Sequence, residues 1–321
     1  MNFQKSLLSA HLRYKTNPCA KFQVSNPYSL GPALICQSVS QSVSHSTFPF
    51  IYRFCNKKIT LNPIFYFINF NITMLMEPSS RWAGRTAVVT GASAGIGAAV
   101  CLRLARAGLN VVGLARRPEL VDLADGGGGS ITSRACDVSQ PEQVAAAFRW
   151  VEESCGGVDV LVNNAGVFHD ANLTELGNNK ISDEDLLATI DINVKGTVLC
   201  ARRALDSMTR RGTAGHIINI NSVAGHYVPF AAGFNVYPST KHAVTAFTQG
   251  LLNELATFKS DIKVTSLSPA LVRTAMAGRL PSAAPALRPG DVADAVLHVL
   301  ATPPAVNITE LTITAVGDKR L

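Results

Sequence analysis

The chain has 321 residues, enough for one large hydrophobic core or two modest ones. Its net charge of +7 comes from residues 1–76, which hold seven Lys or Arg residues and no Asp or Glu. The remainder is electrically balanced, which argues against a dense basic patch and against nucleic acid as a partner. The seven cysteines include no C-x-x-C pair, which predicts reduced thiols in a cytoplasmic protein. No His/Cys/Asp/Glu cluster has metal-ligand spacing, so we expect no metal.

Residues 1–76 differ in composition from the rest, because they are rich in Ser and Asn and show no lasting period. A presequence fits the basic, acid-free composition and would make the protein mitochondrial. A membrane segment over 59–76 is uncharged, but Pro63 and several Asn and Thr residues weaken it. We favour a disordered or wrongly joined extension with the true start at Met74 or Met76. The folded domain is then expected to span 77–321.

The domain opens with a strand, a glycine-rich turn, a helix and a second strand. Residues 85–90 are a β-branched apolar run, 91–97 read GASAGIG, 98–107 predict a helix closed by Gly108, and 110–115 predict a strand. Glycines in such a turn let the backbone approach a pyrophosphate, and the helix N-terminus favours negative charge. A plain glycine turn is the alternative. The turn residues expected to bind a dinucleotide cofactor are Gly91, Ser93, Gly95, Ile96 and Gly97.

The end of the second strand indicates which nicotinamide cofactor the site takes. A site for NAD usually places an acid there to bind the ribose 2′-hydroxyl. This chain has Ala115, followed by Arg116 and Arg117. Guanidinium groups suit a 2′-phosphate, so we predict NADP(H), with solvated arginines as the alternative.

Asp137 and Val138 follow a predicted third strand over 131–136. A carboxylate at this place can accept a hydrogen bond from the adenine amino group. The alternative is that Asp137 caps the helix predicted over 143–153. A fourth strand over 158–162 then leads into the sequence Asn-Asn-Ala-Gly.

The second half brings Tyr237 and Lys241, which are four residues apart at the start of a predicted helix and share one of its faces. Opposite or like charges about 4 Å apart interact by roughly 4 kcal/mol at an effective dielectric near 20. We therefore expect Lys241 to lower the Tyr237 pKa by roughly two or three units. Upstream, a helix over 186–195 carries Asn193, and a strand over 216–221 delivers Ser222 to the carboxyl edge of the sheet.

From about Trp82 onward the chain resembles the short-chain dehydrogenase/reductase superfamily. The residues that carry the resemblance are Thr90–Gly97, Asn163–Gly166, Asn193, Ser222 and Tyr237–Lys241, in the family's order. The resemblance implies a single α/β domain with a Rossmann-type, doubly wound sheet of seven parallel strands. Within the superfamily, residues 216–226 and the step from Ser222 to Tyr237 look like dehydrogenase/reductase family member 11 and the insect farnesol dehydrogenases.

The resemblance also implies roles for four residues. Tyr237 exchanges a proton with the substrate oxygen, Lys241 lowers its pKa and binds the nicotinamide ribose, Ser222 donates to the substrate oxygen, and Asn193 holds a relay water. Ala270 stands where the family usually has glycine, so we expect local strain there. Further cofactor contacts implied by the resemblance are Asn164, Ala165, Gly166, Tyr237, Lys241, Pro269, Val272 and Thr274.

An apolar substrate wall is expected from Val167, Phe168, His226, Tyr227, Phe230, Phe234 and Val236. Of these, Phe168, Tyr227 and Phe230 are predicted to contact substrate together with Ser222 and Tyr237. For His226 we favour a structural role or a place at the pocket edge. Such a wall suits an isoprenoid, retinoid or steroid alcohol or carbonyl, although apolar loops also form dimer contacts. The related proteins suggest a homodimer or homotetramer. A non-catalytic NADP(H)-sensing or scaffolding protein is the rival hypothesis.

Overall fold

The computed structural model describes residues 51–54, 57–60, 79–118, 128–177, 179–229, 232–278 and 284–318. The chain divides into two compact units, Met1–Tyr66 and Phe67–Leu321. In the first unit, β1 (Ile51–Phe54) pairs with β2 (Lys57–Thr60) in antiparallel register. The sequence analysis predicted no regular element here. The proposed start residues Met74 and Met76, and most of the candidate membrane segment, lie outside the described residues.

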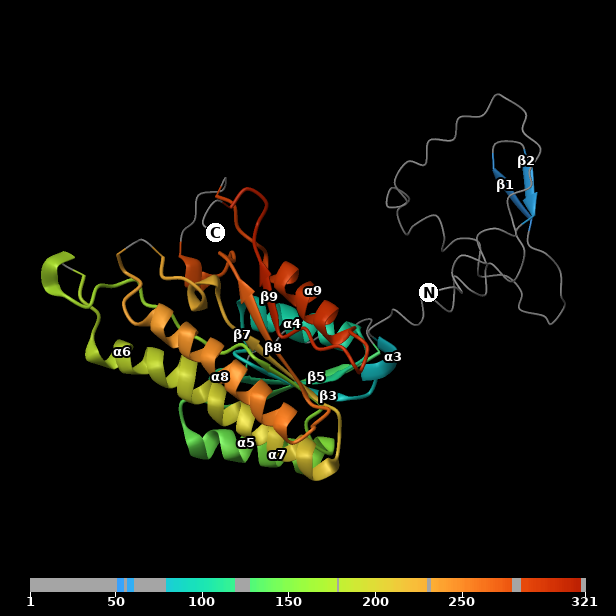
Figure 1. Cartoon of the computed structure of the whole chain (residues 1–321), viewed down its shortest axis with the longest axis horizontal. Coiled ribbons are helices and arrows are strands. Elements are labelled where there is room, and N and C mark those ends of the chain that lie inside the picture. Colours follow the sequence, from blue (N-terminus) through green and yellow to red (C-terminus); the bar gives the residue numbers. More distant parts are fainter. Residues whose placement is uncertain are drawn as a thin grey trace. The chain divides into compact units, whose positions relative to one another are not determined.

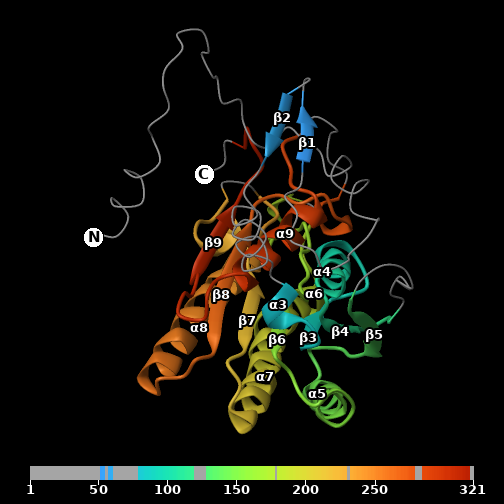
Figure 2. The ribbon, with the colours of Figure 1, turned by 90° about the vertical axis from the view of Figure 1, so that its right-hand side faces the viewer.

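The second unit contains a sheet of seven parallel strands, which confirms the fold class predicted from the sequence. The strand order is β5-β4-β3-β6-β7-β8-β9 (Figures 1 and 2). The strands are β3 (Thr86–Thr90), β4 (Asn110–Ala115), β5 (Ser130–Ala135), β6 (Val160–Asn163), β7 (His216–Ile220), β8 (Lys263–Pro269) and β9 (Glu310–Ile313).

Helices cover both faces of this sheet (Figure 2). On one face lie α3 (Ser79–Trp82), α4 (Gly95–Arg106) and α9 (Pro289–Leu300). On the other lie α5 (Pro141–Cys155), α7 (Thr197–Arg211) and α8 (Tyr237–Thr257). The remaining elements are α6 (Asp183–Ile190), a π-helix η4 (Asp191–Gly196), and the short 3₁₀ helices η3 (Glu175–Gly177), η5 (Val223–Gly225) and η6 (Ala275–Ala277).

Alternating side chains of β3 belong to two hydrophobic clusters on opposite faces of the sheet. Ala87 and Val89 of β3 face α4 and α9, whereas Val88 faces α5 and α7. All three are fully buried, as expected for a parallel strand covered on both faces. Such strands read as continuous apolar runs, which is why the sequence located them.

The strand order reverses between β3 and β6, which are neighbours in the sheet although β4 and β5 separate them along the chain. In open α/β sheets, ligands bind beyond the carboxyl ends of the strands at this switch point. The glycine turn after β3 and the Asn-Asn-Ala-Gly segment after β6 therefore meet there. Within the described residues, no helix has the length and apolar character needed to cross a membrane.

Candidate active site

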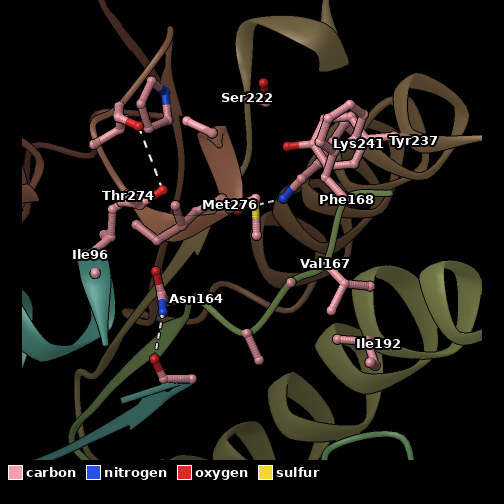
Figure 3. Close-up of a pocket in the computed structure, with 18 of the residues that line it drawn as sticks. Ile96, Asn164, Val167, Phe168, Ile192, Ser222, Tyr237, Lys241, Thr274 and Met276 are labelled. Carbon is pink, nitrogen blue, oxygen red and sulfur yellow. Dashed lines mark hydrogen bonds between the residues drawn. The ribbon is translucent and has the colours of Figure 1, made fainter. Parts of the chain in front are cut away.

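A pocket of about 630 Å³ opens at the carboxyl edge of the sheet (Figure 3). It brings together most of the residues that the sequence predicted for cofactor and substrate. Four predicted residues, Gly97, Asn193, His226 and Val236, do not line it, and Phe230 lies outside the described residues. The predicted residues that line the pocket are Gly91, Ser93, Gly95, Ile96, Arg116, Arg117, Asp137, Val138, Asn164, Ala165, Gly166, Phe168, Ser222, Tyr227, Tyr237, Lys241, Pro269, Val272 and Thr274.

The glycine turn is shaped by left-handed backbone and by close approach. Gly91 and Gly95 have φ of +65° and +57°, a region that glycine enters without steric cost. A Cβ on Gly91 would also lie 2.9 Å from the Ala165 Cα. At Gly97, a Cβ would overlap the Gly91 carbonyl oxygen. Gly97 is therefore needed for the close packing of α4 against the turn. Because it faces the turn, it does not line the pocket.

The N-terminus of α4 faces the pocket without a side-chain cap. Its N-cap residue is Ala94, which has no side-chain hydrogen bond to the first turn. The backbone N–H groups of Gly95 and Ile96 belong to that turn, and both residues line the pocket. Free N–H groups and the helix dipole form a site for a phosphate group. These features fit the pyrophosphate of a dinucleotide.

Thr90 connects the glycine turn to the segment after β6, a role that the sequence analysis missed. Its hydroxyl oxygen accepts hydrogen bonds from the backbone N–H groups of Asn164 and Ala165, both at 3.0 Å. The Asn164 side chain donates in return to the carbonyl oxygens of Thr90 at 2.9 Å and Gly91 at 3.2 Å. The sequence signal that could have revealed this role is a polar residue at the end of an otherwise apolar strand.

Arg116 and Arg117 follow β4 and are exposed at the pocket margin. Within the described residues, neither guanidinium group forms an ion pair or a hydrogen bond, so both are available to a phosphate. Asp137 also lines the pocket. Its Oδ1 accepts from the Ser139 N–H at 2.9 Å and hydroxyl at 2.7 Å. Asp137 thus closes a turn before α5, whose N-cap residue is Gln140.

Tyr237, Lys241 and Ser222 converge in the pocket. Tyr237 begins α8, and both it and Lys241 project from this helix toward the cavity (Figure 3). Ser222 follows β7 and lines the same pocket. The Ser222 hydroxyl oxygen also accepts from the Ala224 N–H at 3.1 Å, which fixes its orientation at the start of η5.

The electrostatics of this pair differ from the prediction. Burial raises the pKa of the Tyr237 phenol, and the hydrogen bond with Ser222 opposes the rise. Burial also lowers the pKa of the Lys241 ammonium from 10.5 to about 8. The Lys241 Nζ donates to the Ile220 carbonyl at 3.0 Å and lies 5.8 Å from the Tyr237 ring centroid. The expectation of a lowered Tyr237 pKa is therefore wrong, because desolvation of the phenol dominates.

Asn193 lies behind the pocket wall, in the π-helix between α6 and α7. Its Oδ1 accepts from the Val167 N–H at 2.8 Å, and its Nδ2 donates to the Val167 carbonyl at 3.0 Å and the Thr240 hydroxyl at 3.1 Å. Asn193 thus fixes both α8 and the segment that leads to Phe168. Its role in a proton relay stays a prediction. The sequence analysis treated 186–195 as ordinary helix and missed the π-turn that directs Asn193 inward.

The segment after β8 closes the pocket over the glycine turn. A Cβ on Gly95 would lie 3.2 Å from the Thr274 Cγ2, so the two turns are adjacent. Ala270 donates its N–H to the Ile313 carbonyl at 2.9 Å and is not among the described residues with positive φ. The expected strain at Ala270 is therefore wrong. Met276 of η6 also lines the pocket, but no residue of this segment beyond Thr274 was predicted.

Aromatic rings form the wall beside Tyr237. The Phe168 ring lies 5.1 Å from the Tyr237 ring in an edge-on arrangement and 5.3 Å from the Phe234 ring. Val167, Phe234 and Tyr227 also line the pocket. His226 does not line the pocket and binds the Ser268 hydroxyl at 2.8 Å through its Nε2, in agreement with the structural role favoured for it. Val236 is not a lining residue either.

Comparisons with known proteins agree with this geometry. A family model described as short chain dehydrogenase matches residues 85–284. Farnesol dehydrogenase from Aedes aegypti is 47% identical over 246 residues, covering 74% of this chain and 99% of that protein. Dehydrogenase/reductase SDR family member 11 from Mus musculus is 41% identical over 249 residues, covering 72% of this chain and 94% of that protein.

Among solved structures, an alcohol dehydrogenase from the archaeon Thermococcus sibiricus complexed with 5-hydroxy-NADP is similar. Its TM-score is 0.64 at 30% identity, and the match covers 72% of this chain and 97% of that chain.

Proposed function

Because the chain belongs to the short-chain dehydrogenase family, we propose that it uses NADP(H) to interconvert a lipophilic alcohol and its carbonyl compound. Family membership makes the protein an oxidoreductase, and the cofactor and the substrate class are the proposal. The observation that carries it is that Tyr237, Ser222 and Lys241 line the same pocket as the glycine turn.

The residues of the pocket fit a dinucleotide with a 2′-phosphate. Gly91, Gly95 and the uncapped N-terminus of α4 would hold its pyrophosphate, and Arg116 and Arg117 would bind the additional phosphate. The solved relative that binds 5-hydroxy-NADP supports this preference. When bound, the cofactor supplies or accepts the hydride.

The proton is exchanged by Tyr237. Burial holds its pKa above the usual value, so the phenol is protonated at neutral pH and acts as the acid in reduction. The Ser222 hydroxyl donates to the substrate oxygen and so orients it toward the phenol. In the oxidative direction the Tyr237 phenol must first lose its proton, and the nearby Lys241 ammonium stabilises the resulting negative charge.

The substrate class follows from the apolar wall and from the relative named farnesol dehydrogenase. Phe168 and Phe234 offer ring surfaces to a long hydrocarbon, and Met276 adds a flexible thioether to the pocket lining. We therefore propose an isoprenoid alcohol such as farnesol, with retinoids and steroids as the other members of the class to be assayed.

Assembly and compartment remain part of the proposal. Apolar side chains are exposed at Leu187 and Ile190 of α6 and at Phe258 after α8, and a homodimer or homotetramer would cover such surface. Light scattering of the purified protein measures this directly, and a monomer would refute it. We also propose a cytoplasmic location, with a mitochondrial one as the alternative if residues 1–76 are a presequence.

The activity is tested by oxidising farnesol with the purified protein and following the absorbance of the reduced nicotinamide. We expect turnover with NADP⁺ and a much lower kcat/KM with NAD⁺. A retinoid, a steroid alcohol and a short alcohol complete the panel. Absence of turnover on every lipophilic substrate, with either cofactor, would refute the proposed function.

A further inference from the structure

Asn235 has an unusual backbone conformation two residues before Tyr237. Its φ is +40°, and among the described residues other than glycine only Lys259 shares a positive φ. Asparagine tolerates the left-handed region better than most residues, but the conformation still needs support from its surroundings. The support comes from the Asn235 side chain itself.

That side chain binds the backbone of two separate pocket segments. The Nδ2 donates to the carbonyl oxygens of His169 at 2.7 Å and Ala171 at 2.9 Å, and lies 3.1 Å from that of Gly233. The Oδ1 accepts from the Val236 N–H at 2.6 Å. Carbonyl oxygens require a donor, so the amide can have only this orientation. The donors and the acceptor of Asn235 are all in use.

The two segments joined by Asn235 carry the three rings of the aromatic wall. Residues 167–172 hold Phe168, and residues 233–237 hold Phe234 and Tyr237. The Ala171 N–H also donates to the Gly233 carbonyl at 3.1 Å, which closes the contact between them. Asn235 therefore determines how the Phe168 ring lies against the Tyr237 ring.

The contact is local to the pocket and not part of either core. Phe168, Phe234 and Tyr237 belong to neither of the two hydrophobic clusters that pack the helices on the sheet. Loss of the Asn235 amide should loosen the wall while leaving the sheet, the glycine turn and Lys241 in place. The effect is then expected on substrate and not on cofactor.

We propose that Asn235 is a positioning residue that fixes the aromatic wall relative to the Tyr237 hydroxyl and thereby sets the preference for long lipophilic substrates. The inference rests on the proposed function, because it concerns the substrate of the same site. A long chain contacts the wall along Phe168 and Phe234, whereas a short alcohol contacts only the region around Tyr237. Displacing the wall should therefore raise KM for the long substrate more than KM for the short one.

The test uses Asn235→Asp, which keeps the shape of the side chain and its tolerance of positive φ. The carboxylate replaces the donor by an oxygen that faces the carbonyls of His169 and Ala171. Substrates are farnesol and prenol, which share an allylic alcohol and differ in chain length. We expect KM for farnesol to rise about tenfold, which corresponds to the free energy of about one hydrogen bond. KM for prenol should change by less than about threefold.

Two controls separate this role from a general defect. Asn253→Asp introduces the same charge at an exposed position of α8 and should leave both KM values unchanged. The affinity of Asn235→Asp for NADPH, measured by fluorescence titration, should stay at the wild-type value. An equal rise for both alcohols, or a matching loss of NADPH affinity, would overturn the proposal.

A double-mutant cycle tests whether Asn235 acts through Phe168. Phe168→Leu removes the ring, so adding Asn235→Asp should raise KM for farnesol little further. Additive effects of the two substitutions contradict the proposal. If Asn235→Asp does not fold, Asn235→Gly removes the same donors and accepts the same φ. Failure of both variants to fold would assign Asn235 to the fold and overturn the proposal. Failure of the wild type to turn over any lipophilic substrate, with either cofactor, would instead refute the proposed function.

Discussion

The substitution Thr90→Val tests how the two turns of the cofactor site are joined. Valine has nearly the shape of threonine and a high β propensity, so β3 should keep its packing. The change removes the hydroxyl oxygen that accepts from the backbone N–H groups of Asn164 and Ala165. Thr90 is 1% exposed, so water cannot replace the hydroxyl from the strand side.

The expected loss follows from the number of donors left without an acceptor. A buried N–H without a partner costs roughly 1–3 kcal/mol, and both N–H groups here are partly buried, so the lower half of that range applies to each. Thr90→Val should therefore lower the free energy of unfolding by about 2–4 kcal/mol. NADPH affinity should also fall, because Asn164 and Ala165 line the pocket.

Thr86→Val is the matched control, at the other end of the same strand. Thr86 is 4% exposed, and its hydroxyl donates one long hydrogen bond, 3.3 Å, to the Cys155 carbonyl. Its removal leaves no N–H group without an acceptor, so we expect a loss of about 1 kcal/mol or less. Urea unfolding measures both variants, with unchanged m-values as the sign that the folded state is intact. Equal destabilisation by the two substitutions would refute the reasoning.

Three further substitutions test the pocket. Arg116→Ala should weaken NADPH binding about tenfold and leave NADH binding unchanged, and equal losses would contradict the 2′-phosphate assignment. Gly97→Ala should destabilise the protein by more than about 2 kcal/mol, because its Cβ would overlap the Gly91 carbonyl oxygen. Its control, Gly250→Ala in α8, has open space and should stabilise by about 0.5–1 kcal/mol. Lys241→Met should abolish turnover and yet stabilise the fold at pH 7. The pKa of this lysine falls from 10.5 to about 8 on folding, which lowers the free energy of unfolding of the wild type by up to about 3 kcal/mol below pH 8. Between pH 8 and 10.5 Lys241 is protonated in the unfolded chain and neutral in the folded one, so the folded wild type gains stability as pH rises through this window. The higher unfolding free energy of Lys241→Met, measured with urea, should therefore disappear over the same range. A less stable variant at pH 7 would contradict this.

Local patterns were enough to predict the sheet and most of the pocket. Buried parallel strands such as β3 are continuous apolar runs, and the glycine turn follows β3 without interruption. The pair Tyr237 and Lys241 is likewise a local feature, because one helical turn determines that both side chains share a face. Strand ends gather at one edge of a parallel sheet, so Ser222 could be placed near them in advance.

Features that depend on distant neighbours could not be predicted. Lys241 donates to the carbonyl of Ile220, a contact that spacing along α8 does not reveal. The π-turn that directs Asn193 inward has no sequence signature in this chain. The prediction of strain at Ala270 was wrong because a glycine at this position in the family does not show that the backbone there needs a positive φ. Asn235 looked like an ordinary loop residue until its three carbonyl partners were known.

The most direct test is Tyr237→Phe, which removes the phenolic hydroxyl and keeps the ring against Phe168. General acid–base catalysis contributes about 10²–10⁴ in rate, so kcat for farnesol should fall at least about a hundredfold. NADPH affinity, measured on the same sample by titration, should stay within about threefold of the wild type, since the cofactor contacts remain. If kcat stays near the wild-type value while NADPH binds normally, the proton is exchanged by another group, and Tyr237 is not the acid of this site.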